Sequence, residues 1–479
     1  MAKITDIIDF NGIGTSEIIA NLKNKSVPVP SWCELVNEYE PSLHEVTKDH
    51  VNLKDKKNGT EKSARISLGL EKLLSLRMSE FTFSIPVKRI YHYPDDNGVY
   101  KDIQAAIEKI YENNHVNTVN LKRGLAYYAA CEVFTIWYTV KKENGLYGFP
   151  CNYKLKCKTY SPMDGVKLYP LMDELDDMLA MSFEYRKKVG DKVITYFETY
   201  TENRHYVWRQ GMDDNNWEEL TAQVGDNGET TNGEEIVIGK IPGAYVWRLQ
   251  PVYHGLSTLR KEIEYTLSRN SNVIAYNAAP VLKISGGIQG MEDKGESRRI
   301  YRVENGGDVS YVSWSQAIEA IKYHVDTMLK FYWMQSQMPD ISFENMKGLG
   351  NIGYDARQTL LTDAHLKIGY EAGAWQEFFE REFNVIKAFL AQMNGKWKPY
   401  LDDITCEHQI TPFIQNDELA DINKRMKANG GKPIESQLES IIKFGQSTDP
   451  DGTLEQIQEE TKAENTARAT AFSMQNQEI

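Results

Sequence analysis

Residues 257–278 read STLRKEIEYTLSRNSNVIAYNA, and their apolar side chains recur at the spacing of one amphipathic helix. The segment that follows, 279–313, contains the strand-like runs VLKI and IYRV, separated by glycine-rich turns. The helix is therefore expected to lead into a small insertion that contains strands. The apolar side of the helix carries Leu259, Ile263, Leu267, Val273 and Ile274.

A second helix is predicted after this insertion. Ser313 and Gln316 fit a capping box, in which two side chains satisfy free backbone N–H groups at a helix start. The helix must end near Pro339, because the residue before a proline is pushed out of helical geometry. Its apolar stripe carries Ile318, Ile321, Val325, Met328 and Leu329.

Residues 348–353 read GLGNIG, which has the G-x-G-x-x-G spacing of a dinucleotide-binding turn. That fingerprint is meaningful only between a strand and a helix inside a βαβ unit. Here a helix end, a proline and a polar stretch precede it, and no apolar strand leads in. We interpret the stretch as a glycine-rich loop between two long helices, and long loops in compact proteins tend to be functional.

A very long helical pattern runs from Asp355 to about Met393. Gly369 and Gly373 lie inside it, and each costs up to about 1 kcal/mol relative to alanine. Paired glycines are a recognised place for a bend, so a kinked helix is expected. From Pro412 onward the chain is polar and helical.

The first part of the chain predicts a mixture of helices and strands. Apolar residues at helical spacing cover 64–83 and precede a β-like run, FTFSIPVKRI. Another helix is expected at 101–114. Residues 124–140 are nearly long enough to cross a bilayer, but Glu132 lies inside the span, which favours a buried helix running into a strand.

Residues 192–209 alternate in polarity around a turn at 201–203, which predicts a β-hairpin. The next stretch, 212–235, holds eight carboxylates and no lysine or arginine. Asp213 and Asp214 could bind a metal, yet nothing convergent surrounds them. We therefore expect a solvated, mobile loop.

Composition limits the function further. The 479 residues carry a net charge of −13, which argues against an open DNA-reading surface, although it is compatible with a protein that surrounds nucleic acid. Five scattered cysteines favour a reducing compartment, and the start of the chain lacks the layout of a signal peptide. No P-loop, G-x-S-x-G or H-E-x-x-H motif occurs, so no catalytic site, metal site or cofactor is predicted.

Several phrases of the chain, in their order, resemble the portal proteins of tailed bacteriophages, in particular the siphophage-type branch. The resemblance is spread over most of the chain and is strongest at GKIPGAYVWRLQPVYHGLSTLRKEIEYTLSRNSNVIAYNAAPVLKISG. The other phrases are FTFSIPV, IEKIYENNHVNTVNLKRGLAYYAACEVFTIWYTVKKENG, KTYSPMDGVKLYPLMD, MPDISFENMKGLGNIGYDARQTLL and PIESQLESIIKFGQSTDPDGTLEQIQEE.

This resemblance implies a multi-domain α+β portal fold that forms a ring, usually of twelve subunits. The implied parts are an α+β wing (1–256), a first stem helix (257–278), a small α/β clip (279–313), a second stem helix (314–336), a tunnel loop (337–353), a long kinked helix returning to the wing (354–411) and a helical crown with the C-terminal tail (412–479).

The implied function is a channel for DNA packaging and ejection at one capsid vertex of the virion, after assembly in the host cytoplasm. The implied partners are further copies of the chain, double-stranded DNA bound without sequence specificity, the terminase large subunit, head-completion or adaptor proteins, and the major capsid and scaffolding proteins. No membrane is implied. The candidate tunnel-loop residues are Ser342, Glu344, Asn345, Lys347, Gly348, Gly350, Asn351 and Gly353, and the candidate channel-facing stem residues are Lys322 and Lys330.

Two other functions stay open at this point. One is a different structural component of the virion, such as an adaptor or minor capsid protein, which would lack a closed ring with a DNA-wide channel. The other is a nucleotide-binding enzyme built on GLGNIG, which the missing strand before that loop disfavours.

Overall fold

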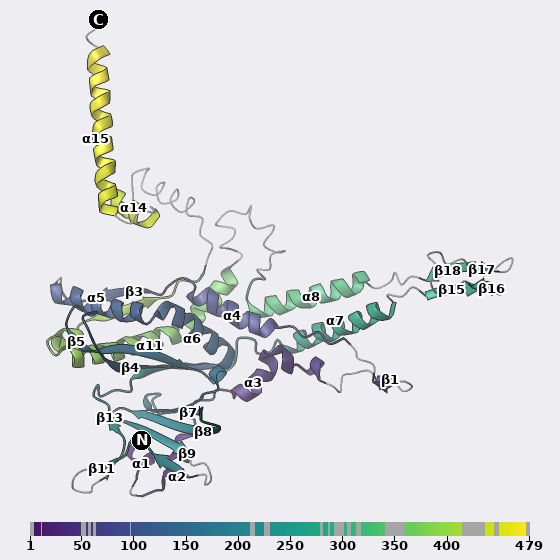
Figure 1. Ribbon diagram of the computed structural model, residues 1–479, viewed down its shortest axis with the longest axis horizontal. Helices are drawn as coiled ribbons and strands as arrows, with labels where there is room; N and C mark the ends of the chain where they lie inside the picture. The colour runs from purple at the N-terminus through teal and green to yellow at the C-terminus, as the bar shows by residue number, and fades with distance from the viewer. Residues whose placement is uncertain are drawn as a thin grey trace. The chain divides into compact units, whose positions relative to one another are not determined.

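The computed structural model divides the chain into two compact units (Figure 1). The first comprises Met1–Gly348 and Thr359–Phe413, and the second comprises Leu349–Gln358 and Ile414–Ile479. The structure describes residues 4–10, 12–48, 54–55, 59–60, 64–95, 97–210, 216–224, 230–277, 281–285, 288–291, 301–303, 308–312, 318–340, 359, 361–413, 436–444 and 450–475.

Two antiparallel sheets form the centre of the first unit. The smaller has three strands in the order β14-β4-β5, and the larger has the order β10-β9-β8-β7-β6, with β13 also paired to β9. The strands of the smaller sheet are β4 (Glu132–Asn144), β5 (Cys151–Tyr160) and β14 (Gly243–Trp247). Those of the larger sheet are β6 (Lys167–Met172), β7 (Met178–Val189), β8 (Lys192–Thr201), β9 (Arg204–Gln210), β10 (Trp217–Glu219) and β13 (Glu234–Glu235).

Apolar side chains join the sheets and helices into layers. Helices α4, α5, α6 and α11 share buried clusters with one face of the smaller sheet. Its other face packs on the larger sheet through residues such as Phe134 and Phe183, and helix α2 covers the far face of the larger sheet. The helices of these layers are α2 (Thr15–Leu22), α4 (Leu70–Phe83), α5 (Gly98–Asn113), α6 (Val116–Ala130) and α11 (Thr362–Met393).

The remaining elements of this unit are short. Strand β3 (Lys88–His92) pairs with β19 (Thr405–Gln409), next to α11. The others are α1 (Ile4–Ile7), α3 (Trp32–Tyr39), η1 (Pro41–Leu43), η2 (Glu45–Thr47), β1 (Lys54–Asp55), β2 (Gly59–Thr60), η4 (Pro162–Asp164), β11 (Gln223–Val224), β12 (Thr230–Thr231) and α12 (Lys398–Leu401).

Several local predictions are confirmed. Helix α6 ends at Ala130 and β4 begins at Glu132, so the apolar stretch 124–140 is a helix that runs into a strand. Strands β8 and β9 form the hairpin expected at 192–209. None of the described helices has the length and apolar character to cross a membrane. The described residues also have the predicted α+β class.

Two local predictions are wrong. The run FTFSIPVKRI was expected to be β-like, but Phe81 and Phe83 end α4, where both side chains are buried, and the strand begins only at Lys88. Burial of these two rings in the helical layer outweighs the strand preference of aromatic residues. The acidic stretch 212–235 is also not a plain loop, because its described residues include β10 and β13, which extend the larger sheet.

Helix α7 (Ser257–Asn277) and helix α8 (Ile318–Ser336) contact each other and leave the body of the first unit together (Figure 1). The described residues between them form two antiparallel strand pairs, β15 with β18 and β16 with β17. Ser313 and Gln316, the expected capping box, lie outside the described residues. The strands are β15 (Val281–Ser285), β16 (Ile288–Met291), β17 (Tyr301–Val303) and β18 (Asp308–Val312).

Helix α11 is continuous from Thr362 to Met393 and contains Gly369 and Gly373. No atom of the described residues lies within 4 Å of where a side chain would start at either glycine, so packing among the described residues does not require them. The expected kink remains a prediction.

The second unit contains α14 (Gln437–Phe444) and α15 (Pro450–Gln475), which contact each other. Ser436 caps α14: its hydroxyl accepts from the Glu439 backbone N–H, while the Glu439 carboxylate accepts from the Ser436 backbone N–H. This reciprocal pattern is a capping box, and it accounts for the start of the helix.

Candidate functional site

The α7–α8 pair contains the described part of the predicted site. Lys322 and Lys330 both lie on α8 and are exposed, and neither forms an ion pair within the described residues. Glu319 and Asp326 are exposed on the same side of the helix, at helical spacing from Lys330. The outer face of α8 is therefore mixed in charge rather than uniformly basic.

The predicted tunnel loop cannot be placed. Its candidate residues, and the GLGNIG stretch with them, lie outside the described residues. These residues are Ser342, Glu344, Asn345, Lys347, Gly348, Gly350, Asn351 and Gly353.

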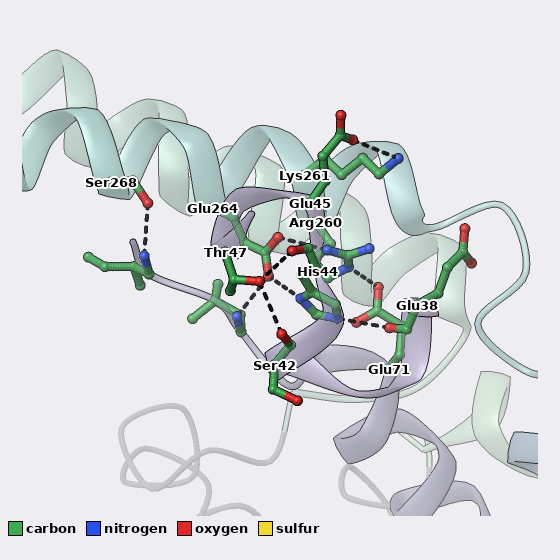
Figure 2. Close-up of polar contacts among 12 residues, drawn as sticks. Glu38, Ser42, His44, Glu45, Thr47, Glu71, Arg260, Lys261, Glu264 and Ser268 are labelled. Carbon is green, nitrogen blue, oxygen red and sulfur yellow. Dashed lines mark hydrogen bonds and ion pairs between the residues drawn. The ribbon is translucent and has the colours of Figure 1, made fainter. Parts of the chain in front are cut away.

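A buried ionic cluster fixes the root of α7 to the rest of the unit (Figure 2). Arg260 Nε donates to Glu71 Oε1 on α4 at 2.6 Å, and Arg260 Nη1 donates to Glu264 Oε2 at 2.7 Å. Glu264 Oε1 in turn lies 2.6 Å from His44 Nδ1, between η1 and η2. All four side chains are at most 1% exposed, so three segments far apart in sequence meet at one charged core, which we call the root cluster.

The hydrogen bonds of the root cluster constrain its protons. His44 Nε2 lies 2.9 Å from the Glu38 carbonyl oxygen, which can only accept, so this nitrogen carries a hydrogen. The other ring nitrogen, Nδ1, faces the Glu264 carboxylate. Glu71 Oε2 is buried with no partner in the described structure. Burial raises the pKa of Glu71 to about 7, against the opposing effect of Arg260.

A ladder of hydrogen bonds continues from the root cluster along α7. Glu264, Ser268 and Asn272 accept from the backbone N–H groups of Leu68, Ile66 and Ala64 at 2.8, 2.9 and 2.7 Å. Four helical residues advance about 6 Å. Two extended residues advance about 6.6 Å. The two repeats match, so alternate amides of 64–68 meet every fourth side chain of α7.

The C-terminal end of α8 is also attached to the body. Lys367 on α11 donates its Nζ to the carbonyl oxygen of Ser336, the last residue of α8, at 2.7 Å. A cation is favoured at a helix C-terminus, where carbonyl groups lack partners. Burial lowers the pKa of Lys367 to about 8, while Glu371 has the opposite effect. Both helices of the pair are thus attached to the body through charged side chains.

Sequence reasoning missed the root cluster. Its only local sign is that Arg260 and Glu264 stand four residues apart beside Ile263, on the side of α7 that was expected to be apolar. Glu71 lies 189 positions from Arg260 in the sequence, and His44 lies 220 positions from Glu264. No spacing rule connects residues so distant.

Comparison with known proteins identifies the family. A family model described as "Phage portal protein, SPP1 Gp6-like" matches residues 29–467. Among curated proteins, no match to the chain is found.

Among solved structures, the chain resembles one chain of a structure titled "Virion of native gene transfer agent (GTA) particle", with 12% identity, 89% of this chain and 98% of that chain covered, and a TM-score of 0.34. A TM-score at this level supports no conclusion. The family model, however, covers most of the chain, and the protein therefore belongs to the phage portal protein family of the SPP1 Gp6-like type.

Proposed function

We propose that this protein forms a ring, with twelve subunits as the expected number, at the unique vertex of a phage capsid. The ring is the channel through which DNA enters and leaves the head, and the protein is a part of the virion that assembles in the host cytoplasm. Family membership is the observation that carries this proposal. In this function the protein is structural, with no catalytic site or cofactor of its own.

The α7–α8 pair is proposed as the stem of the ring, and the strands β15 to β18 as the clip. The charged attachments of both helices at the body end of the pair support this assignment, because a wall that bears a moving duplex must be fixed to its base. The residues 337–353 are proposed as the tunnel loop, 354–411 as the long helix and its return to the wing, and 412–479 as the crown.

The electrostatics suit a channel that guides DNA without holding it. Each phosphate contact adds salt-sensitive affinity, so a uniformly basic lining would slow a sliding duplex. The chain carries a net charge of −13, and the outer face of α8 mixes Lys322 and Lys330 with carboxylates. We propose these two lysines, with Lys347 in the loop, as isolated cationic points that centre the DNA.

The remaining partners follow from this position in the particle. The clip is proposed to dock the terminase large subunit during packaging and the head-completion or adaptor proteins afterwards. The wing and crown are proposed to face the major capsid and scaffolding proteins. No membrane contact is part of the proposal.

Mass photometry with negative-stain imaging of the purified chain tests the ring directly. The expected result is a closed ring with countable symmetry and a central hole wide enough for duplex DNA. A protein that stays monomeric at all salt and protein concentrations would refute the proposal.

The tunnel loop has its own test. Deleting 342–353 is expected to leave the ring intact and to abolish DNA packaging in an in vitro assay with terminase and empty heads. Normal packaging by this variant would remove the loop from the proposal without removing the ring.

A further inference from the structure

The hairpin of β4 and β5 concentrates positive charge in an acidic chain. Residues 138–158 contain five lysines and one glutamate, whereas the chain as a whole has a net charge of −13. The four lysines considered next form no ion pair with the described residues, although Lys158 Nζ lies 4.6 Å from the centre of the Tyr160 ring. The positive charge of the hairpin is therefore not neutralised within the part of the chain that the structure describes.

The strand register brings three of these lysines to one face. Lys158, Lys156 and Lys154 on β5 stand opposite Ile136, Tyr138 and Val140 on β4, and paired residues point to the same side of a sheet. Lys142 follows on β4 at the point where the pairing with β5 becomes irregular, between Lys141 and Asn144, and adds a fourth charge next to this row. We define the basic strip as Tyr138, Val140, Lys142, Lys154, Lys156 and Lys158.

The strip is rigidly supported and open to solvent. On the opposite face of the same strands, Trp137 and Leu155 are fully buried under the helical layer, so the hairpin cannot turn over. On the strip itself, Tyr138 and Val140 are 42% and 43% exposed. Lys142 and Lys158 are exposed as well, Lys154 and Lys156 are half-buried, and the strip contains no carboxylate.

The chemistry of the strip suits a phosphate backbone. Lysines two residues apart on one strand stand about 6.8 Å apart, so three of them form a short, straight row of point charges. Lysine ammonium and tyrosine hydroxyl groups are among the usual donors to phosphate oxygens, and such contacts carry no sequence information. A duplex offers phosphates continuously along its axis, so it can meet the row in any register.

We propose that the basic strip contacts duplex DNA inside the capsid, as a second DNA surface separate from the channel helices. Figure 1 shows β5 at the end of the first unit away from α7 and α8. The proposal rests on the proposed function, because DNA surrounds this face only if the protein is mounted in a DNA-filled head. An acidic protein surface is the competing partner, and the test below separates the two.

The test compares two triple variants of the full chain in its assembled form. One neutralises the strip with Lys154→Gln, Lys156→Gln and Lys158→Gln. The matched control carries Lys187→Gln, Lys188→Gln and Lys192→Gln, which remove three exposed lysines from the β7–β8 end of the same unit. Binding of a fluorescent random-sequence duplex is measured by anisotropy over a series of salt concentrations.

Each lost phosphate contact lowers the slope of log affinity against log salt by about 0.9. The strip variant is therefore expected to lose about 2 to 3 units of slope. The control variant is expected to lose less than about 1. Equal losses in the two variants, or no loss in the strip variant, would overturn the proposal.

Assembly provides the second readout. If the unmodified chain forms rings and the strip variant does not, the strip is a contact between subunits and the DNA proposal is wrong. If the unmodified chain forms no ring at all, the proposed function fails instead, which mass photometry detects before any DNA is added.

Discussion

Among the described residues of the first unit, two arginines are fully buried, and their surroundings differ in the balance of charge. Arg123 on α6 faces one carboxylate, that of Glu382 on α11, with Nη2 to Oε1 at 2.5 Å. Trp137 Nε1 donates to the same oxygen at 3.0 Å, and Arg123 also donates to Thr135 and Asn120. The charges of Arg123 and Glu382 cancel, and both side chains have further hydrogen-bond partners. We call these two residues the closed pair.

Arg260 faces two carboxylates, those of Glu71 and Glu264, and Glu264 also faces the imidazole of His44. One arginine therefore stands against two carboxylates, and the cluster is neutral only when it holds one additional proton. The Arg123–Glu382 pair lies inside the body and is neutral without a bound proton. The root cluster connects the body to the helix pair and is neutral only with one. We expect the first to resist pH and the second to respond to it.

Breaking the closed pair should have the largest effect. Arg123→Met leaves the Glu382 carboxylate buried with no cation, and losing one partner of a buried pair costs about 3–5 kcal/mol. We expect a loss near the upper end of this range, measured as the shift of the urea midpoint, because α6, β4 and α11 all meet here.

Glu382→Gln is the matched variant for this site. It removes the charge but keeps an oxygen that can accept from Arg123 and Trp137, so it should also destabilise the chain, since Arg123 then lacks an anion. If either variant unfolds at the same urea concentration as the unmodified chain, the pair does not join these three elements.

Breaking the root cluster should come next. Arg260→Met is expected to lower the free energy of opening of α7 by about 3–4 kcal/mol, because two carboxylates then share one buried site. Hydrogen exchange of α7 and of 64–72 measures this, and the β7–β8 amides should change much less.

Lys261→Met is the control at the neighbouring position. Lys261 forms an ion pair with Glu45 at 3.5 Å, and both side chains are more than 40% exposed. Exposed pairs contribute about 0–1 kcal/mol, so this variant should leave α7 protected. Equal exchange in the two variants would mean that burial of Arg260 is not what fixes the helix.

The contrast between these joints also explains what could be predicted from the sequence. Helices and strands whose apolar spacing is local, such as α7, α8 and the β8–β9 hairpin, were predicted close to their observed bounds. The joints could not be, because Arg123 and Glu382 are 259 residues apart and pair only once the layers have packed. At Phe81 and Phe83 the helical pattern over 64–83 overlapped the β-like run, and distant residues decide between the two because they determine the burial of both rings.

The candidate site was predicted less completely than the fold. Lys322 and Lys330 were expected to face the channel, and this expectation stays a prediction. Both are exposed, and Glu319 and Asp326 beside them make this face of the helix mixed in charge. The tunnel-loop residues remain predictions. A single sequence shows which charged side chains are present. Whether a lysine's charge is neutralised depends on which carboxylates share its surface, and only the structure shows that.

The third prediction concerns pH. The folded pKa of Glu71, about 7, is above its ordinary value of 4.5, so the folded state binds a proton more tightly than the unfolded state does. The stability from this group is fully present below pH 4.5 and is lost as pH rises through 7. Over that window the opening free energy of the α7 root should fall by up to about 3 kcal/mol.

Glu71→Gln removes this titration and keeps an oxygen for Arg260 Nε. Hydrogen exchange corrected for intrinsic rates should show a flatter pH profile for α7 in this variant than in the unmodified chain. The amides of α6 near the closed pair serve as the internal reference. Identical profiles in both proteins would assign the proton to another group.

The smallest effect is expected on the ladder. Ser268→Ala removes the acceptor of the Ile66 N–H but leaves the root cluster intact, so the exchange of 64–68 should increase by the equivalent of about 1 kcal/mol. Thr266→Ala, which removes an exposed hydroxyl bonded to Glu262, should change this exchange by less than about 0.5 kcal/mol. Because only the root cluster contains the extra proton, the Ser268→Ala effect should also be independent of pH, and a pH-dependent effect would mean that ladder and cluster open as one unit.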